Sequence, residues 1–379
     1  MKSKWIWMFI LLLSLSITNA QKPKTFLFIG SYTQGQPATG IYVYTFHPKS
    51  GALKQVSFVD DITNPSFINL SPDGHFLYAC TDTKLPDTGS VTAFKIDATN
   101  GKLSFINRQA SGGDNPVYLS VHSSGKWLIN ANYTGGSVSA FALNEDGSIQ
   151  PSAQSIQFAG KSIREDRQEK PHIHSAVFSP QGDYAFLPDL GSDKIWVFGF
   201  DPAKPKPLTL IEEDIVVSVP GSGPRHFTFH PTGKFAYCLE ELSGFVSSYA
   251  YADGALKTIQ RIYANKYQQD TCRSADIHIS PDGRFLYASN RDGRENTIAI
   301  FSIDQSNGML TLVSHQSTYG DHPRNFTIDP TGRFLLVANM ASGNIVVFKR
   351  NLKTGLLTRT KNEIQVTSPS CLQMRTYGR

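Results

Sequence analysis

Ser71-Pro72-Asp73-Gly74-His75-Phe76-Leu77-Tyr78-Ala79 is the stretch that decides the fold, because edited copies of it recur along almost the whole chain. The turn glycine of each copy is Gly74, Gly125, Gly182, Gly233, Gly283 or Gly332. The intervals between these glycines are 51, 57, 51, 50 and 49 residues. This is the length of a four-stranded propeller blade, and it is too long for ankyrin, tetratricopeptide or leucine-rich repeats.

Each copy has the same order of features. An apolar strand leads into a tight turn, an aromatic strand follows, and a third strand starts at glycine or serine, as in residues 90–96. Proline suits the second position of a turn and glycine tolerates a positive φ, so each turn should close a hairpin. The two occur together at Pro72/Gly74, Pro180/Gly182, Pro231/Gly233, Pro281/Gly283 and Pro330/Gly332. No helical period interrupts the strands, which predicts an all-β protein.

The two ends of the chain hold the pieces of one further repeat. Residues 26–33 resemble 76–83, a second strand without its first, and residues 368–374 resemble 64–70, a first strand without the rest. We therefore predict a single seven-bladed β-propeller over residues 21–379. The C-terminal strand should be the innermost strand of the first blade and close the ring, which removes an open sheet edge.

The first 20 residues differ from the repeats. Lys2 and Lys4 precede an apolar run over residues 5–17, and small residues follow the run. This pattern is typical of a cleaved signal peptide, so residues 1–20 should be removed and the protein exported, either periplasmic or secreted. The alternative is an uncleaved anchor, but the run is shorter than the roughly 20 residues that span a bilayer. After cleavage we expect no membrane association.

Composition excludes several classes of function. The chain is 40% hydrophobic and 18% charged, and its net charge of +5 gives little support for binding to nucleic acid. It has no Walker loop, no Rossmann fingerprint and no His/Cys spacing for zinc, so no cofactor or metal is expected. Asp189 could ligate a cation, but a single carboxylate does not supply the about six to eight oxygens that calcium prefers.

The four cysteines are expected to be free thiols. Cys80, Cys238 and Cys371 lie within predicted strands, where a thiol behaves as a small buried hydrophobe. Cys272, at the mouth of a strand, is expected to be exposed. The chain has no CxxC motif, which argues against redox catalysis.

Residues that lie the same number of positions before or after the turn glycine should occupy equivalent places in successive blades. Residues with a function should therefore differ in type from their equivalents in the other blades. Eight residues before the glycine stand Ser66, Val117, His174, Arg225, Ala275 and Arg324. Ten residues before it stand Asn64, Asn115, His172, Gly223, Arg273 and His322. Eight residues after it stand Asp82, Tyr133, Leu190, Glu241, Arg291 and Met340. Residues two positions apart in a strand lie on the same side of it. The second strand runs antiparallel to the first, so its end lies at the rim of the ring where the first strand began.

The charged members of these positions should therefore converge on one mouth of the central channel. They are His172, His174, Arg225, Glu241, Arg273, Arg291, His322 and Arg324. Arginines and histidines in this number, beside a single carboxylate, make an electropositive pocket suited to an anion. The alternative is a set of ordinary rim salt bridges, such as Glu241 with Arg225 or Arg291.

Several motifs set in this repeat resemble one known family. They are Gly223-Pro224-Arg225-His226, Pro171-His172-Ile173-His174-Ser175, Glu241-Leu242, Ser289-Asn290-Arg291 and His322-Pro323-Arg324-Asn325-Phe326. With them the chain resembles the lactonase family of seven-bladed propellers over essentially all of residues 25–375. The best-known members of that family are the propeller-type 6-phosphogluconolactonases, and it is related to fungal carboxymuconate cyclase.

The resemblance implies a catalytic set. The His, Arg, Glu and Arg of the cyclase site are similar to His172 or His174, Arg225, Glu241 and Arg291, and the choice between the two histidines stays open. The chain departs from its relatives at Glu240, where they often carry asparagine, and in residues 271–276, where they usually lack the cysteine and the basic residue Arg273.

These residue types suit the opening of a lactone. Glu241 or a histidine of the Pro-His-x-His element would be the general base, a histidine the acid, and Arg225 or Arg291 would stabilise the oxyanion. Arg324 and Arg273 would hold a substrate carboxylate or phosphate. The expected substrate-binding residues are Arg324, Arg273, His322 and Asn325.

We therefore expect a lactonase, similar to 6-phosphogluconolactonase, that acts on a small anionic or sugar-derived lactone. The alternatives are a carboxymuconate-type cycloisomerase and a non-catalytic exported binding module. The predicted export argues against 6-phosphogluconolactone itself, which belongs to cytoplasmic carbohydrate metabolism. The extra length in residues 150–170 is either a solvated loop or a lid over the pocket.

Overall fold

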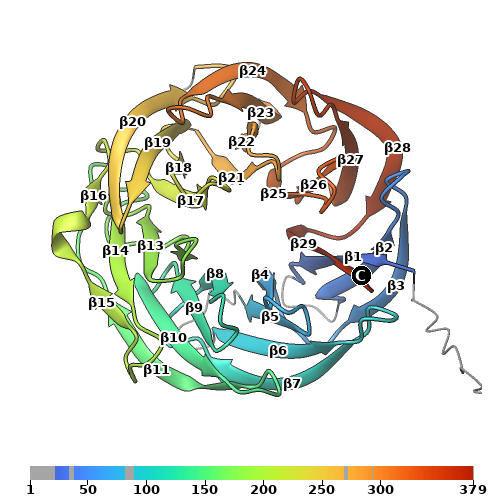
Figure 1. Cartoon of the computed structure of the whole chain (residues 1–379), viewed down its shortest axis with the longest axis horizontal. Coiled ribbons are helices and arrows are strands. Elements are labelled where there is room, and N and C mark those ends of the chain that lie inside the picture. The colour runs from blue at the N-terminus through green and yellow to red at the C-terminus, as the bar shows by residue number, and fades with distance from the viewer. Residues whose placement is uncertain (1–21, 34–37, 82–88, 269–271, 293, 379) are drawn as a thin grey trace, which may run out of the picture.

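The described chain forms seven antiparallel sheets arranged as blades around a common axis, so the predicted seven-bladed β-propeller is confirmed (Figure 1). The computed structural model describes residues 22–33, 38–81, 89–268, 272–292 and 294–378. The predicted signal peptide, residues 1–20, lies outside these ranges. In the described residues no α-helix is present, and no helix has the length and apolarity needed to cross a membrane.

The second, third and fourth blades follow one another in the chain. The second contains β4 (Pro65–Leu70), β5 (Phe76–Thr81), β6 (Ser90–Ile96) and β7 (Leu103–Ala110). The third contains β8 (Pro116–Val121), β9 (Trp127–Asn132), β10 (Ser137–Leu143) and β11 (Ile149–Gln157). The fourth contains β12 (Val177–Phe178), β13 (Tyr184–Asp189), β14 (Lys194–Phe200), β15 (Leu208–Leu210), the 3₁₀ helix η1 (Glu212–Asp214) and β16 (Val216–Val217), which pairs with β14.

The next three blades repeat the same order. The fifth contains β17 (Pro224–Phe229), β18 (Phe235–Glu240), β19 (Phe245–Ala252) and β20 (Ala255–Tyr263). The sixth contains β21 (Ser274–Ile279), β22 (Phe285–Asp292), β23 (Glu295–Ile303) and β24 (Leu310–Ser317). The seventh contains β25 (Pro323–Ile328), β26 (Phe334–Asn339), β27 (Asn344–Arg350) and β28 (Leu357–Gln365). In each of these blades the first strand is innermost, and the chain moves outward strand by strand.

The first blade joins the two ends of the chain, as predicted. It contains β1 (Lys24–Ser31), β2 (Ile41–Phe46), β3 (Leu53–Val59) and the C-terminal strand β29 (Pro369–Tyr377). β29 pairs with β1 in antiparallel register from Lys24↔Tyr377 to Ser31↔Pro369 and is the innermost strand of the sheet. The ring is therefore closed by backbone hydrogen bonds between the first and last strands.

The repeated turn has the predicted backbone. Its glycines have φ values between 69° and 85°, a left-handed conformation that side chains with a Cβ rarely adopt. Each hairpin therefore brings the second strand back antiparallel to the first, and the start of the first strand lies beside the end of the second. This geometry places the predicted site residues at one mouth of the ring.

Apolar side chains pack between neighbouring blades and form the core. One cluster contains Phe28 of the first blade, Ile68 and Leu77 of the second, and Leu128 of the third, all fully buried. Tyrosines reinforce four of the interfaces between described blades, since each donates from its hydroxyl to a carbonyl of the next blade. These bonds are Tyr78 to Gly147 at 3.1 Å, Tyr237 to Gly308 at 2.9 Å, Tyr287 to Gly355 at 2.8 Å and Tyr377 to Gly74 at 2.9 Å.

All four cysteines are free and buried. This confirms the prediction for Cys80, Cys238 and Cys371. The prediction for Cys272 was wrong, because its side chain is fully buried near Asn265 and Gly244 rather than exposed. The loop that carries it packs onto the fifth blade, where its backbone N–H donates to the Leu242 carbonyl at 3.2 Å.

Candidate active site

Arg225 and Glu241 form a buried ion pair at one mouth of the ring. Arg225 is the second residue of β17, and Glu241 follows the last residue of β18, which pairs with the first residue of β17. The Arg225 Nε atom donates to Glu241 Oε2 at 2.8 Å, and the two residues are 1% and 3% exposed. The antiparallel hairpin therefore explains why residues 16 positions apart in the sequence meet.

Glu241 also receives hydrogen bonds from two further arginines. Arg291, near the end of β22, donates from Nη2 to Oε2 at 2.9 Å, and Arg167 donates from Nη2 to Oε1 at 2.7 Å. Burial alone would raise the pKa of Glu241, but Arg291, Arg225 and Arg167 together lower it well below the usual range. Glu241 is therefore a carboxylate whose main contacts are arginine side chains.

Arg225 links the fifth and sixth blades as well as pairing with Glu241. Its Nη1 atom donates to the backbone carbonyl of Ala275 in β21. Burial and the nearby charge of Arg291 lower the pKa of Arg225 to about 9, which leaves the guanidinium protonated at neutral pH. Its charge is thus held in a fixed position by two blades.

Arg291 determines the state of His322. The Arg291 Nη1 atom donates to His322 Nε2 at 3.0 Å, so Nε2 is the acceptor and the neutral ring carries its proton on Nδ1. Burial and the charges of Arg291 and Arg324 lower the pKa of His322 to about 3. The imidazole is therefore neutral at physiological pH.

His322 also has an unusual backbone for its residue type. Its φ is 61°, and the residues at the same repeat position, Asn64, Asn115 and Gly223, have φ values of 43°, 56° and 64°. Asparagine and glycine are the residues that tolerate this left-handed conformation best. Four of the six residues at this repeat position share the conformation, while His172 and Arg273 do not, and His322 adopts it at some conformational cost.

His172 is oriented by Tyr133. Its Nδ1–H donates to the Tyr133 carbonyl at 3.0 Å, and the two rings stack with centroids 4.5 Å apart. The other ring nitrogen, Nε2, lies 3.3 Å from a carboxylate oxygen of Glu169. The backbone N–H of His172 donates to Asp189 Oδ1 at 2.7 Å. The segment before β12 is therefore held through both the backbone and the side chain of His172.

His174 lies deeper in the ring. Its ring packs edge-on against Tyr133 at 5.2 Å and His226 at 5.4 Å. Among the described residues, none makes a hydrogen bond to His174 Nδ1, which is buried. Burial and the charge of Arg225 lower the pKa of His174 well below its usual value, so this histidine is neutral.

The predicted substrate-binding residues are placed differently from one another. The Arg324 guanidinium lies over the Tyr32 ring at 5.3 Å, and its charge contributes to the low pKa of His322. Asn325 is turned into the ring, where Nδ2 donates to Asp276 at 2.6 Å and Oδ1 accepts from the Leu372 N–H at 2.7 Å. Asn325 therefore joins the seventh blade to the sixth and first.

Arg273 contributes its backbone rather than its side chain to the cluster. Its carbonyl accepts a hydrogen bond from Arg291 Nε at 3.2 Å, while the side chain is exposed. Glu240 is also separate from the cluster. Its carboxylate accepts from the hydroxyls of Ser243 and Ser247 and pairs with Arg261 at 2.7 Å, on the far side of the strand from Glu241.

Asp189 is a structural acceptor in the described chain. Its carboxylate accepts hydrogen bonds from the backbone of His172, Gly191 and Ser192, from the Ser192 hydroxyl and from the Trp196 indole at 3.1 Å. No group of His, Cys, Asp or Glu side chains suited to a metal ion is found among the residues that the structure describes.

The structure adds Arg167 and Tyr133 to the site. Arg167 comes from the long segment 158–171 and reaches both Glu241 and the Tyr133 hydroxyl, at 3.3 Å from the latter. The sequence shows several charged residues in this segment, but not which of them turns inward. Its neighbour Arg164 pairs with Asp166 at 3.1 Å instead.

Comparison with known proteins finds relatives over nearly the whole chain. A family model described as "Lactonase, 7-bladed beta-propeller" matches residues 26–374. A 6-phosphogluconolactonase from Formosa agariphila is 48% identical over 352 residues, which is 93% of this chain and 100% of that protein. A 6-phosphogluconolactonase from Bacillus subtilis is 36% identical over 349 residues, which is 91% of this chain and 97% of that protein. The structure of a periplasmic gluconolactonase from Pseudomonas aeruginosa superposes with a TM-score of 0.87 at 35% identity, covering 93% of this chain and 99% of that one.

Proposed function

The chain belongs to the lactonase family of seven-bladed β-propellers, and on that premise we propose that it hydrolyses a small anionic lactone, as 6-phosphogluconolactonases do. The observation that supports this most directly is the buried cluster of Arg167, Arg225 and Arg291 around Glu241. Three guanidinium groups share one carboxylate, so the mouth keeps a net positive charge. A phosphate or carboxylate on the substrate would be attracted to it.

Glu241 is a poor candidate for the general base. A carboxylate whose pKa lies far below neutral takes up a proton only weakly, and both Glu241 oxygens already accept from arginines. We assign Glu241 the role of orienting Arg225 and Arg291. Their positive charge would stabilise the oxyanion that forms when water attacks the lactone carbonyl.

We assign the general base to His172. Because its Nδ1–H is held by the Tyr133 carbonyl, the lone pair of the neutral ring lies on Nε2. Glu169, 3.3 Å from Nε2, would stabilise the imidazolium that forms when Nε2 takes a proton from water. The same proton would then pass to the departing ring oxygen, which leaves an open hydroxy acid and the neutral histidine.

The acidic group of the substrate would bind on the opposite side of the mouth. Arg324 is proposed to hold the phosphate or carboxylate, with Arg273 able to reach it from the exposed rim. The neutral His322, held by Arg291, would present its Nδ1–H to a substrate oxygen. An anion bound there would offset the arginine charges and raise the pKa of the nearby histidines.

The test is hydrolysis of a lactone panel at constant pH, with 6-phosphogluconolactone, gluconolactone and carboxylated γ-lactones as substrates. We expect His172→Gln and Arg225→Ala to lower kcat by about a hundredfold or more, because they act on the transition state. His322→Asn keeps the left-handed backbone and should raise KM for the anionic substrates. The matched control is Arg359→Gln, on the outer strand β28, which should retain wild-type activity.

Two results would overturn the proposal. Full activity in a folded Arg225→Ala variant would remove the arginine cluster from catalysis. Inactivity of the wild-type protein on every lactone, with turnover of a carboxymuconate, would favour a cycloisomerase.

We also propose that the protein is exported. The Pseudomonas aeruginosa relative is a periplasmic protein, and residues 1–20 carry the predicted signal pattern. Cell fractionation with mass spectrometry of the mature N-terminus tests this. A cytoplasmic protein that retains residues 1–20 would contradict it.

A further inference from the structure

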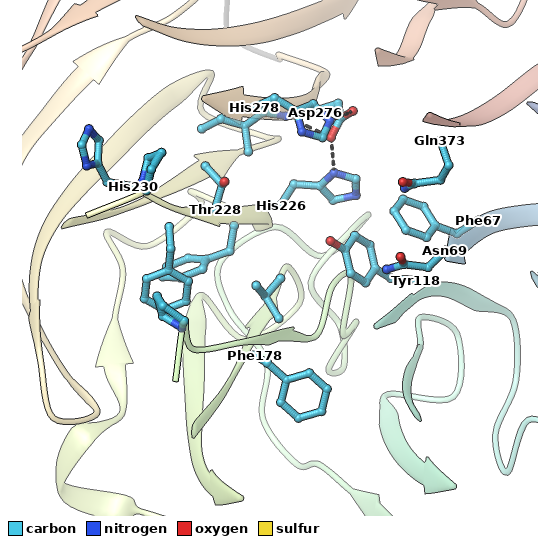
Figure 2. A pocket seen from close by; sticks show the side chains of 16 residues that line it. Phe67, Asn69, Tyr118, Phe178, His226, Thr228, His230, Asp276, His278 and Gln373 are labelled. Carbon is cyan, nitrogen blue, oxygen red and sulfur yellow. Dashed lines mark hydrogen bonds and ion pairs between the residues drawn. The ribbon is translucent and has the colours of Figure 1, made fainter. Parts of the chain in front are cut away.

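A second cavity lies at the mouth opposite the arginine cluster. It has a volume of about 400 Å³ and is lined by residues of β4, β8, β12, β17, β21 and β29, all of them innermost strands (Figure 2). The lining residues of β17 run from His226 to the end of the strand at Phe229, whereas Arg225 is near its start. The cavity therefore begins directly after the level of Arg225 and continues to the end of the strand that is farther from the arginine cluster.

A small space lies between the arginine cluster and the cavity. It is lined by Arg225 and Arg324 and also by Phe67 and His226, which line the cavity as well, and its volume is about 10 Å³. That is near the lower limit for one water molecule. A substrate at the arginine cluster therefore cannot pass through this space into the cavity.

The polar wall of the cavity is built on a buried carboxylate. Asp276, 2% exposed, accepts hydrogen bonds from several donors. They are His226 Nδ1, His278 Nε2, Asn325 Nδ2 and the backbone N–H groups of Ile277 and Phe326. Because Nδ1 of His226 donates at 2.7 Å, its Nε2 atom carries the lone pair of the neutral ring.

Two polar atoms at this wall lack partners among the described residues. His226 is 5% exposed and its Nε2 makes no hydrogen bond, and the Tyr118 hydroxyl makes none either. Figure 2 shows the Tyr118 hydroxyl on the side of the ring that faces His226, with the amides of Asn69 and Gln373 nearby. The rings of Tyr118 and His226 are 5.3 Å apart at 74°, and Tyr118 stacks on Phe67 at 4.1 Å.

The charge of the cavity differs from that of the arginine mouth. Its lining residues include no lysine and no arginine, and its one carboxylate, Asp276, is saturated by hydrogen bonds. An anion would find no counter-charge there, and a cation would find no free carboxylate oxygen. The Phe67 ring, which stacks on Tyr118, supplies aromatic surface beside the unpartnered acceptor and hydroxyl.

We propose that this cavity is a second ligand site, which binds a neutral, hydroxyl-bearing ring of monosaccharide size. The C–H face of such a ring would pack on the aromatic wall, and its hydroxyls would bond to His226 Nε2, the Tyr118 hydroxyl and the Gln373 amide. The volume lies within the range of small-molecule pockets. The site is independent of the arginine cluster and of the reaction assigned to it.

The test is binding of a panel of neutral probes, methyl β-D-glucopyranoside, methyl β-D-galactopyranoside and glucitol, measured by NMR titration. At least one should bind, and glucose 6-phosphate should not displace it. Thr228→Trp, which fills the cavity, should abolish binding, and Tyr118→Phe should weaken it about tenfold by removing one hydrogen bond. Arg359→Gln is the control, and unfolding temperatures establish that each variant is folded.

Three results would overturn the proposal. One is a wild-type protein that binds none of the neutral probes at millimolar concentration. Another is binding that survives in a folded Thr228→Trp variant, which would place the ligand elsewhere. The third is displacement of the neutral probe by glucose 6-phosphate, which would assign the binding to the arginine mouth.

Discussion

Glu241 is the residue on which the arginine cluster depends, and its loss should be visible in stability as well as in activity. Glu241→Gln removes the negative charge that, among the residues the structure describes, Arg225 and Arg291 pair with, so it leaves buried positive charges unpaired. We expect the free energy of unfolding in urea to fall by about 3 kcal/mol.

The matched control is Glu363→Gln. Glu363 pairs with Arg359 at 2.8 Å on the exposed strand β28. Its loss should change the free energy of unfolding by less than about 1 kcal/mol. Equal effects of the two substitutions would show that the Glu241 cluster is no more important to the fold than a surface pair.

Buried histidines make the fold sensitive to acid. Burial, with the charge of Arg225, lowers the pKa of His226 to about 4, whereas an unfolded histidine titrates near 6.5. Between pH 6.5 and 5 the unfolded chain therefore binds protons that the folded chain does not. The free energy of unfolding should therefore decrease as the pH is lowered across this window, by up to about 1.4 kcal/mol per pH unit for His226.

His174 and His322 act in the same direction, since their pKa values are also lowered. His278 acts in the opposite direction, because Asp276 raises its pKa despite burial. Urea titrations at pH 7 and pH 5.5 test the net effect. The difference should shrink in a His226→Gln variant, and a stability that rises on acidification would contradict this account.

Single residues also show how far the sequence could predict the site. Comparing equivalent positions of the repeat identified Arg225, Glu241 and Arg291, because antiparallel hairpins bring fixed offsets together. It could not identify Arg167, since that residue lies in an insertion with no counterpart in the other blades. Asn325 was expected to contact the substrate, and this stays a prediction. Its amide joins three blades in the structure, and side-chain direction after the β-bulge at Pro323/Asn325 does not follow from spacing.

At the scale of elements, the segment 158–171, here called the strap, contacts the rest of the ring through two side chains. Gln168 is fully buried and donates to the Leu190 carbonyl at 2.8 Å, and Arg167 reaches Glu241. Ile163, between them and β11, is 67% exposed. Both predictions for the strap, a lid and a solvated loop, stay predictions, and Arg167 is its contact to the proposed site.

Limited trypsin digestion tests the strap. Arg167→Ala should speed cleavage after Lys161 several-fold, because one of the two attachments is lost. Arg164→Ala, which removes only a pair with the exposed Asp166, is the control and should leave that rate nearly unchanged. A substrate or product bound at the arginine mouth should slow cleavage in the wild-type protein, and an unchanged rate would argue against a lid.

The elements themselves follow closely from the sequence because the repeat supplies several independent copies of one pattern. The turn glycines and the split first blade agree with the structure. The fourth blade is the exception, since its innermost strand β12 has two residues. There the backbone before β12 is held by hydrogen bonds to side chains such as Asp189, and not by a full set of hydrogen bonds between strands. The periodicity of the strands does not reveal this difference.

At the scale of the whole molecule, stability depends on β29. A chain that ends at Thr367 would lose this strand and expose the inner edge of β1. We expect such a chain to aggregate and to elute in the void volume in gel filtration, because an unpaired edge strand pairs with other chains. Removal of residues 378–379 alone is the control and should leave the elution volume unchanged. A stable, monomeric 1–367 chain would show that the other six blades hold the ring closed without it.

The pairing of β1 with β29 also has a consequence for biosynthesis. Of the described strands β1 is made first and β29 last, so the first blade stays incomplete until β29 has left the ribosome. The partners Lys24 and Tyr377 are 353 residues apart, and contacts of such long range form slowly. The ring therefore closes only after β29 has been made, and a nascent chain that lacks this strand remains a substrate for chaperones.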